Sequence, residues 1–326
     1  MRTSSAKISL LIVIAVIISA CNAVKRVPEG KQLLVKNKLV VNGEKTKDDA
    51  IAAQLYQEPN SSIFGYKLRL NLYNLANPNP DSSYQAKFID NPKKYQRLSK
   101  ILSKKQVDRL GKSFWYSGIH NFLKKTGEPP IIVDEKSTSK SENRIRAYYF
   151  NKGYFDVTAS AVTDTVAPKK AEITYTINTE EPYYIDSLKT IIASPTLDSL
   201  YKKSKASAQL QSGKVYQTKD FDLEKERITT QFRNNGVFQF QQNYVRFDID
   251  TIDVGKNKAN VDLIIDDYSY RVGDSTKTTE FKIFHVKEVN IYTTDQTNKN
   301  FEKVDSTTYK GFNLYSNGKH RYSAKS

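Results

Sequence analysis

The chain has 326 residues and a mass of 37.2 kDa, which exceeds one typical domain, so two or three modules are expected. With 38% hydrophobic and 26% charged residues, it cannot be a wholly disordered, collagen-like or polytopic membrane protein. The net charge of +16 favours anionic surroundings without choosing among them. A single Cys and three scattered His exclude a disulfide framework and a Cys-cluster zinc site.

The N-terminus has the pattern of an export signal. Basic residues precede an apolar stretch over residues 8–18, and the small residues Ser19 and Ala20 lie directly before Cys21. The apolar stretch is about half of the ~20 residues that a transmembrane helix needs. We therefore expect residues 1–20 to be a cleaved signal peptide rather than a permanent anchor.

This segment resembles the signal of bacterial lipoproteins, and the resemblance implies that Cys21 is acylated and that residues 21–30 form a tether. The alternative is an ordinary signal peptide followed by an incidental Cys. Several acyl chains hold a protein on a membrane where one chain would be released. No acidic run follows Cys21, so we expect the Gram-negative outer membrane, with the modules in the periplasm and no nucleic acid as partner.

The sequence repeats itself with a spacing of 83 residues, between Gly153-Tyr154-Phe155 and Gly236-Val237-Phe238. Each Gly ends a predicted helix, at residues 141–152 in the first copy and 220–235 in the second. Two strand candidates follow each Gly, and a further strand candidate opens each unit. These strands are expected at residues 31–41, 154–166 and 171–178, at 182–192, 237–252 and 259–265, and at 281–292 for a third unit. The predicted order is β-α-α-β-β.

The first unit carries an insertion at about residues 59–140, between its two helices. Within it, residues 95–125 have the pattern of a basic amphipathic helix. That pattern fits a core-facing stripe with a solvated basic face, and it also fits a surface that docks on a membrane or a partner. Residues 126–142, which contain Pro129 and Pro130, are the expected flexible break.

The repeat resembles polypeptide-transport-associated (POTRA) modules, which precede outer-membrane barrels. The segment from Asn143 through Gly153-Tyr154-Phe155 to the turn at Glu181 carries this resemblance. The lipoprotein signal, followed by Glu58-Pro59-Asn60 and Ile63-Phe64-Gly65, is similar to the lipid-anchored BamA/TamA relatives often called TamL.

The resemblance implies an α+β fold of tandem POTRA modules, each a three-stranded mixed sheet with two helices on one face. The first module is expected at residues 31–181 and the second at 182–270. Residues 271–326 would be the start of a truncated third module, and the C-terminal barrel of the family is not expected in this sequence.

The same resemblance implies a periplasmic arm of an outer-membrane assembly or translocation factor. Its partners would be unfolded outer-membrane proteins, a TamB-like protein anchored in the inner membrane, and the lipid bilayer through acylated Cys21. An edge of a sheet can pair with an incoming strand through backbone groups alone. The candidate edges are the second strands of the two modules, with Val157, Ala159, Ala161 and Thr163 in the first and Tyr244, Arg246 and Asp248 in the second.

The sequence contains no Walker-type phosphate loop, no Gly-x-Ser-x-Gly elbow and no His-Glu-x-x-His helix. It therefore predicts no catalytic residue, no metal site and no cofactor, and the protein is not expected to be an enzyme. The alternative function is an outer-membrane lipoprotein adaptor that binds a polyanion or a lipid surface through a basic face. Strong salt dependence would favour that alternative over strand addition.

Overall fold

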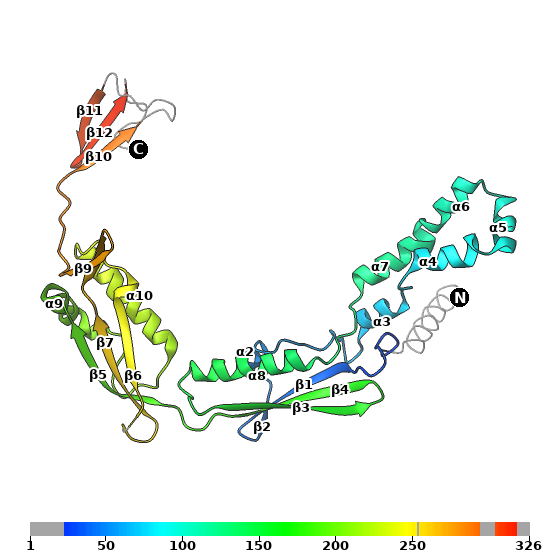
Figure 1. Cartoon of the computed structure of the whole chain (residues 1–326), viewed down its shortest axis with the longest axis horizontal. Helices are drawn as coiled ribbons and strands as arrows, with labels where there is room; N and C mark the ends of the chain where they lie inside the picture. The colour runs from blue at the N-terminus through cyan, green and yellow to red at the C-terminus, as the bar shows by residue number, and fades with distance from the viewer. Residues whose placement is uncertain (1–22, 253, 294–303, 318–326) are drawn as a thin grey trace, which may run out of the picture. The chain divides into compact units, whose positions relative to one another are not determined.

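The computed structural model describes residues 23–252, 254–293 and 304–317, so the predicted signal peptide and Cys21 lie outside the described residues. The chain divides into two compact units, Met1–Pro182 and Tyr183–Ser326 (Figure 1). Among the described residues, no helix combines the length and the apolar character that crossing a bilayer requires.

The first unit contains a mixed sheet of four strands in the order β2-β1-β4-β3 (Figure 1). The strands are β1 (Leu33–Val41), β2 (Glu44–Thr46), β3 (Thr158–Ala167) and β4 (Lys170–Asn178). β1 runs parallel to β4, whereas β2 and β3 are antiparallel to their neighbours. In β4, residues on one face are buried and those on the other are half-buried, as the alternation in the sequence predicted.

The prediction of three strands for this module is wrong, because β2 adds a fourth. Asn42 and Gly43 adopt φ values of 50° and 85°, the left-handed geometry that closes a two-residue hairpin between β1 and β2. The Asn42 carboxamide also donates to Thr179 Oγ1 at 3.0 Å and accepts from its backbone N–H at 3.0 Å, which fixes the turn to the end of β4.

Two helices pack on this sheet. They are α2 (Asp49–Ala52), capped by Asp48, and α8 (Glu135–Phe150), capped by Asp134. Their buried side chains, Ile51 from α2 and Ile145 and Tyr149 from α8, join the strand residues in one core cluster. That cluster also contains Leu34, Leu39, Leu55, Val157, Ala159, Ile173, Tyr175 and Ile177.

The predicted flexible break at residues 126–142 is wrong. Asp134 accepts a hydrogen bond from the Ser137 backbone at 3.0 Å, so α8 begins six residues before the predicted helix start. The preceding segment is also fixed, since Leu34 donates to the Ile131 carbonyl at 2.8 Å and Val133 donates to that of Gln32 at 2.9 Å.

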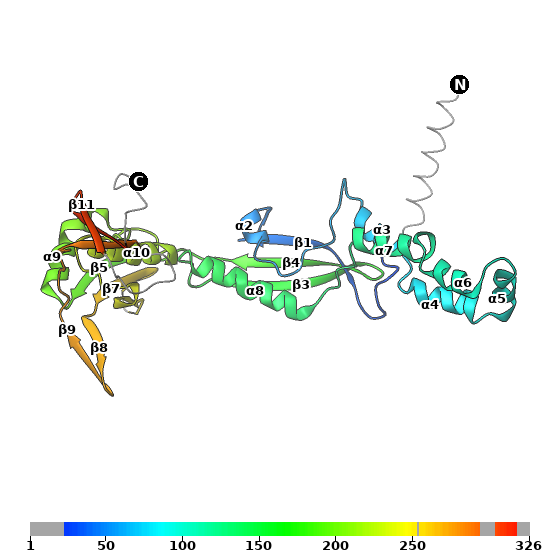
Figure 2. The ribbon, with the colours of Figure 1, turned by 90° about the horizontal axis from the view of Figure 1, so that it is seen from above.

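The insertion between α2 and α8 is helical, but the single amphipathic helix predicted at residues 95–125 is wrong. Seven short segments follow one another (Figure 2): α3 (Leu68–Leu75), α4 (Pro80–Tyr84), η1 (Gln85–Ile89), α5 (Pro92–Ser99), α6 (Lys104–Gly111), η2 (Phe114–Gly118) and α7 (Ile119–Thr126). A capping box of Ser103 and Gln106 starts α6 and separates it from α5.

The second unit has the predicted β-α-α-β-β order. It runs through β5 (Tyr184–Ile192), α9 (Pro195–Ser204), η3 (Lys205–Ser207), α10 (Thr218–Asn234), η4 (Gln242–Tyr244), β6 (Val245–Asp250) and β7 (Lys258–Ile265). The sheet order is β5-β7-β6, with β5 parallel and β6 antiparallel to β7. Leu197 of α9 and Ile228 and Phe232 of α10 are fully buried against this sheet. The α+β class and the repeated order are therefore confirmed.

The segment after β7 differs from the prediction. β8 (Tyr268–Val272) and β9 (Ser275–Thr279) form an unpredicted hairpin. Phe281 is only 3% exposed and packs on the rings of Phe240 and Tyr244, with centroids 5.2 and 5.0 Å away. Because Phe281 belongs to this core, the strand predicted at residues 281–292 begins only at β10 (Val289–Thr293).

A third sheet follows, where the sequence predicted only an opening strand. β10 pairs with β12 (Phe312–Asn317), which also pairs with β11 (Val304–Tyr309). The order β10-β12-β11, with β10 parallel and β11 antiparallel to β12, repeats the order of the sheet β5-β7-β6.

Gly236 provides a test of how the Phe281 segment is held. Its φ is +90°, and an added Cβ would lie 2.7 Å from the Phe284 carbonyl oxygen and 2.8 Å from Ile283 Cγ2. Gly213 has a similar φ of +85° with nothing within 4 Å. Gly213→Ala should cost about 1 kcal/mol of unfolding free energy, and Gly236→Ala about 1 to 3 kcal/mol more, since packed atoms must move. Urea unfolding followed by circular dichroism measures both; equal losses would contradict this packing.

Candidate functional site

The second strand of each module lies at an edge of its sheet, β3 in the first unit and β6 in the second. The sequence left open which edge is free. The opposite edges are partly covered: in the first unit by β2 and the Leu33–Ile132 bridge, and in the second by the segment around Val215, which bridges to Tyr184. In the described chain, β3 and β6 have no such cover.

The backbone of β3 shows which residues face outward from this edge. The Ile177 carbonyl on β4 accepts from Asn42, on the side away from β3. Ile177 is opposite Ala159, whose own carbonyl accepts from Arg146 Nη1 at 3.3 Å. Backbone groups of an antiparallel strand alternate between its two sides. Because the backbone groups of Ile177 point away from β3, the opposite residue Ala159 makes no ladder hydrogen bond to it, and the N–H and C=O groups of Ala159 point away from β4. The N–H and C=O groups of Ala161 and Thr163, two and four residues further on, therefore also face outward.

The predicted β3 site residues differ in availability. Val157 precedes the strand and is buried, and Ala159 is buried with its carbonyl occupied by Arg146. Ala161 is half-buried and Thr163 is exposed. Since a bulge interrupts the pairing between Thr165 and Ala167, the uncovered part of this edge is residues 160–165.

The β6 edge is shorter and more charged. Tyr244 lies in η4, one residue before the strand. Arg246 donates to Asp266 at 2.9 Å and lies 3.5 Å from Asp248; the hydrogen bond to Asp266, with the charges of both carboxylates, raises the pKa of Arg246. β6 has three charged residues in six, whereas β3 has only Asp164 in ten. Charged side chains on an edge oppose strand addition, so β3 is the better candidate.

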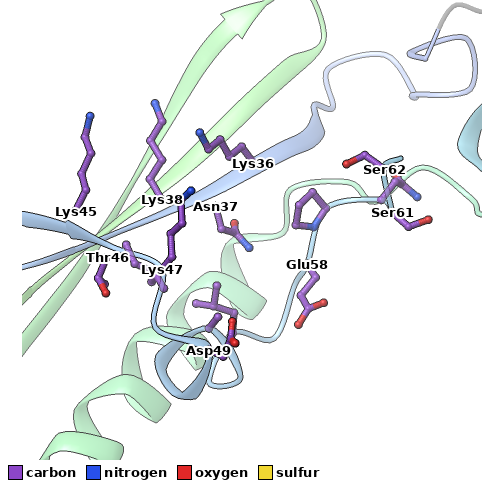
Figure 3. A pocket seen from close by; sticks show the side chains of 15 residues that line it. Lys36, Asn37, Lys38, Lys45, Thr46, Lys47, Asp49, Glu58, Ser61 and Ser62 are labelled. Atoms are coloured by element: carbon purple, nitrogen blue, oxygen red, sulfur yellow. The ribbon is translucent and has the colours of Figure 1, made fainter. Parts of the chain in front are cut away.

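A pocket of about 560 Å³ lies beside β1, β2, α2 and residues 58–62 of the first unit. Figure 3 shows Lys36, Lys38 and Lys45 pointing the same way from the two strands, with Asp49 at the start of α2 and Glu58 on the other side. Lys38 forms an ion pair with Glu172, which raises the pKa of Lys38. No His or Cys lines the pocket, and the described residues contain no group of three or more His, Cys, Asp or Glu suited to a metal ion.

The segment from Asn60 to Arg69, which carries part of the family resemblance, is fixed by a residue that sequence reasoning missed. Glu128 accepts from Ser61 N at 3.0 Å and Ser61 Oγ at 2.7 Å, and pairs with Arg69 at 2.8 Å. Burial raises the pKa of Glu128, but these hydrogen bonds, that of Asn60 and the charge of Arg69 outweigh it and hold the pKa below its usual range. No local pattern identifies this partner, because 67 residues separate it from Ser61.

Comparison with known proteins gives similar solved structures only; no protein-family model and no curated protein matches the chain. Haemophilus influenzae BamA POTRA3-5 is 15% identical, with 74% of this chain and 99% of that structure covered and a TM-score of 0.27. The N-terminal domain of Omp85 from Thermosynechococcus elongatus is 11% identical, with 89% and 97% covered and a TM-score of 0.25.

A third match is Haemophilus ducreyi BamA lacking POTRA domains 1-3, at 12% identity and a TM-score of 0.28. This match covers 44% of the present chain, which spans only 26% of that structure. The fold assignment rests on the strand order and pairing described above.

Glu128 predicts a pH dependence of stability. A carboxyl group whose pKa is lowered by folding stabilises the protein above its unfolded pKa of about 4.3, and this contribution is lost as the pH falls through the folded pKa. Glu128→Gln should lower the unfolding free energy by roughly 1 to 3 kcal/mol at neutral pH, and the difference from the wild type should shrink toward pH 3.

Urea unfolding followed by far-UV circular dichroism measures this effect. Glu44→Gln, at an exposed position, is the control for loss of one negative charge. A difference between wild type and Glu128→Gln that stays constant with pH would contradict the role assigned to Glu128.

Proposed function

We propose that the chain is a periplasmic POTRA arm of an outer-membrane protein assembly or translocation factor of the TamL type. In this proposal it is anchored through acylated Cys21 and binds unfolded outer-membrane proteins by strand addition. The observation that carries the proposal is the repeated module whose second strand forms an uncovered sheet edge. The similar structures reported above include POTRA3-5 of BamA and the N-terminal domain of Omp85.

β3 is the proposed principal binding strand. It is ten residues long, and its outward backbone groups at Ala161 and Thr163 alternate as an added antiparallel strand requires. Val162 and Val166, at 58% and 49% exposure, offer apolar contact beside these groups. Because backbone pairing reads few side chains, such an edge suits clients of varied sequence.

The remaining parts of the proposal concern residues and partners other than the β3 edge. Signal cleavage after residue 20 and a tether at residues 21–30 follow from the N-terminal sequence pattern and its resemblance to lipoprotein signals. A TamB-like inner-membrane partner follows from the family resemblance alone. The modules at residues 31–181 and 182–270 would form the arm. Residues 271–326 would begin a third module, and a barrel, where present, would be supplied by sequence beyond this arm or by a partner.

Thr163→Pro tests strand addition at β3. Proline removes the outward N–H of residue 163 while leaving the β3–β4 ladder in place, so client binding should weaken by roughly tenfold or more. Thr163→Ala keeps the N–H and is the matched control. Fluorescence anisotropy of a labelled, urea-unfolded outer-membrane barrel protein, diluted into protein solution, measures the affinity.

Circular dichroism melts show whether both variants stay folded, and titrations at low and high salt separate backbone pairing from polyanion binding, which weakens steeply with ionic strength. Equal affinity of Thr163→Pro and Thr163→Ala would contradict strand addition at β3. An affinity that falls steeply with salt and is the same for Thr163→Pro and Thr163→Ala would favour the alternative, an adaptor that binds a polyanion or a lipid surface.

A further inference from the structure

The helical insertion has a small core of its own. The Tyr84 side chain is 5% exposed and packs against the rings of Phe88 and Tyr116, with centroids 5.1 and 4.7 Å away. Its hydroxyl donates to the Val107 carbonyl at 2.7 Å, and Gly111 lies so close to the ring that a Cβ there would clash. This core holds α4, α6 and η2 together.

Several other large apolar side chains of the insertion are exposed. Ile101, in the turn between α5 and α6, is 85% exposed, and Trp115 in η2 is 81% exposed. Phe114 and Phe122 are 59% and 58% exposed. Single exposed apolar residues are ordinary, but several large ones on one small helical segment mark an interaction surface.

The same segment is strongly basic. Residues 92–126 contain ten Lys or Arg and one acidic residue, Asp108. Nine of the ten are exposed; Lys124 is half-buried and donates to the Pro78 carbonyl at 2.7 Å. Among the described side chains, none of these ten cations forms an ion pair. Ten cations against one acidic residue leave the segment strongly basic.

The base of the insertion holds the start of the described chain. The Asn74 carboxamide on α3 donates to the Ala23 carbonyl at 3.1 Å, and Lys25 donates to the Asn74 carbonyl at 3.2 Å. α3 is in turn joined to the end of α7, where Arg69 Nε donates to the Thr126 carbonyl at 3.2 Å. Ala23 follows Cys21 by two residues, so a lipid on Cys21 would be attached within about 7 Å of this base.

We propose that residues 92–126 form a docking surface for the anionic headgroups of a phospholipid bilayer, with Trp115 at the interface. Exposed Lys and Arg attract such headgroups, and Trp and Phe side chains partition into the region between headgroups and acyl chains. This inference rests on the proposed membrane location of the chain but not on client binding. The surface would lay the insertion on the membrane that carries the lipid anchor.

Trp115 reports directly on this surface because it is the only Trp in the chain. The full-length acylated protein is reconstituted with vesicles of phosphatidylcholine alone or of phosphatidylcholine with phosphatidylglycerol. The anchor holds the protein on both, so a difference in emission measures docking of the insertion. We expect a blue shift of Trp115 emission, and quenching by brominated acyl chains, with phosphatidylglycerol; both should diminish at high salt.

Lys104→Glu combined with Lys105→Glu should remove most of this shift, because both side chains are exposed on α6. The matched control reverses the exposed Lys282 and Lys287 of the second unit, which changes the net charge equally. Circular dichroism checks the fold of each variant. The comparison of the two kinds of vesicle uses the wild-type protein, so it does not depend on whether a variant folds.

Emission that is the same on both kinds of vesicle, or a shift that both double variants lose equally, would overturn the proposal. So would a shift with soluble polyglutamate and none with vesicles, which would assign the surface to an acidic protein. Client binding is measured in solution without vesicles, so it does not depend on whether the insertion docks on lipid. The two experiments therefore distinguish a failure of lipid docking from a failure of strand addition.

Discussion

The parallel pairing of the opening and closing strands of each module is the constraint on which the rest of the structure depends. β1 pairs with β4 and β5 with β7 in parallel, and parallel neighbours need a long crossover connection. The helices of each module lie within that crossover and cover one face of the sheet. The strand before the closing strand pairs on the outer side of the closing strand in both modules, so β3 and β6 lie at edges of their sheets.

This constraint also explains where the insertion is tolerated. The crossover from β1 to β4 already contains α2 and α8, and the added helices of residues 68–126 leave the parallel register unchanged. Long insertions into a connection cost little conformational entropy once the sheet is formed. The insertion has its own aromatic core around Tyr84, so the apolar side chains at Ile101 and Trp115 remain free for another partner.

Sequence reasoning predicted what short-range patterns encode. The alternation in β4 and β7 and the glycine after each second helix were sufficient for the β-α-α-β-β order. β2 was missed because a strand of three residues is too short to show alternation. The break before α6 was missed because the Ser103–Gln106 capping box lies within a stretch whose apolar residues recur at helical spacing. Glu128, the Phe281 packing and the direction of the β3 backbone depend on contacts between distant segments, which one sequence does not reveal.

The central claim is that the outward backbone groups of β3 bind client strands, and residue-resolved amide hydrogen exchange with and without an unfolded barrel protein tests it most directly. The account predicts that the amides of Ala161 and Thr163 exchange rapidly in the free protein and become protected when the client binds. Client binding that leaves exchange at Ala161 and Thr163 unchanged would contradict it.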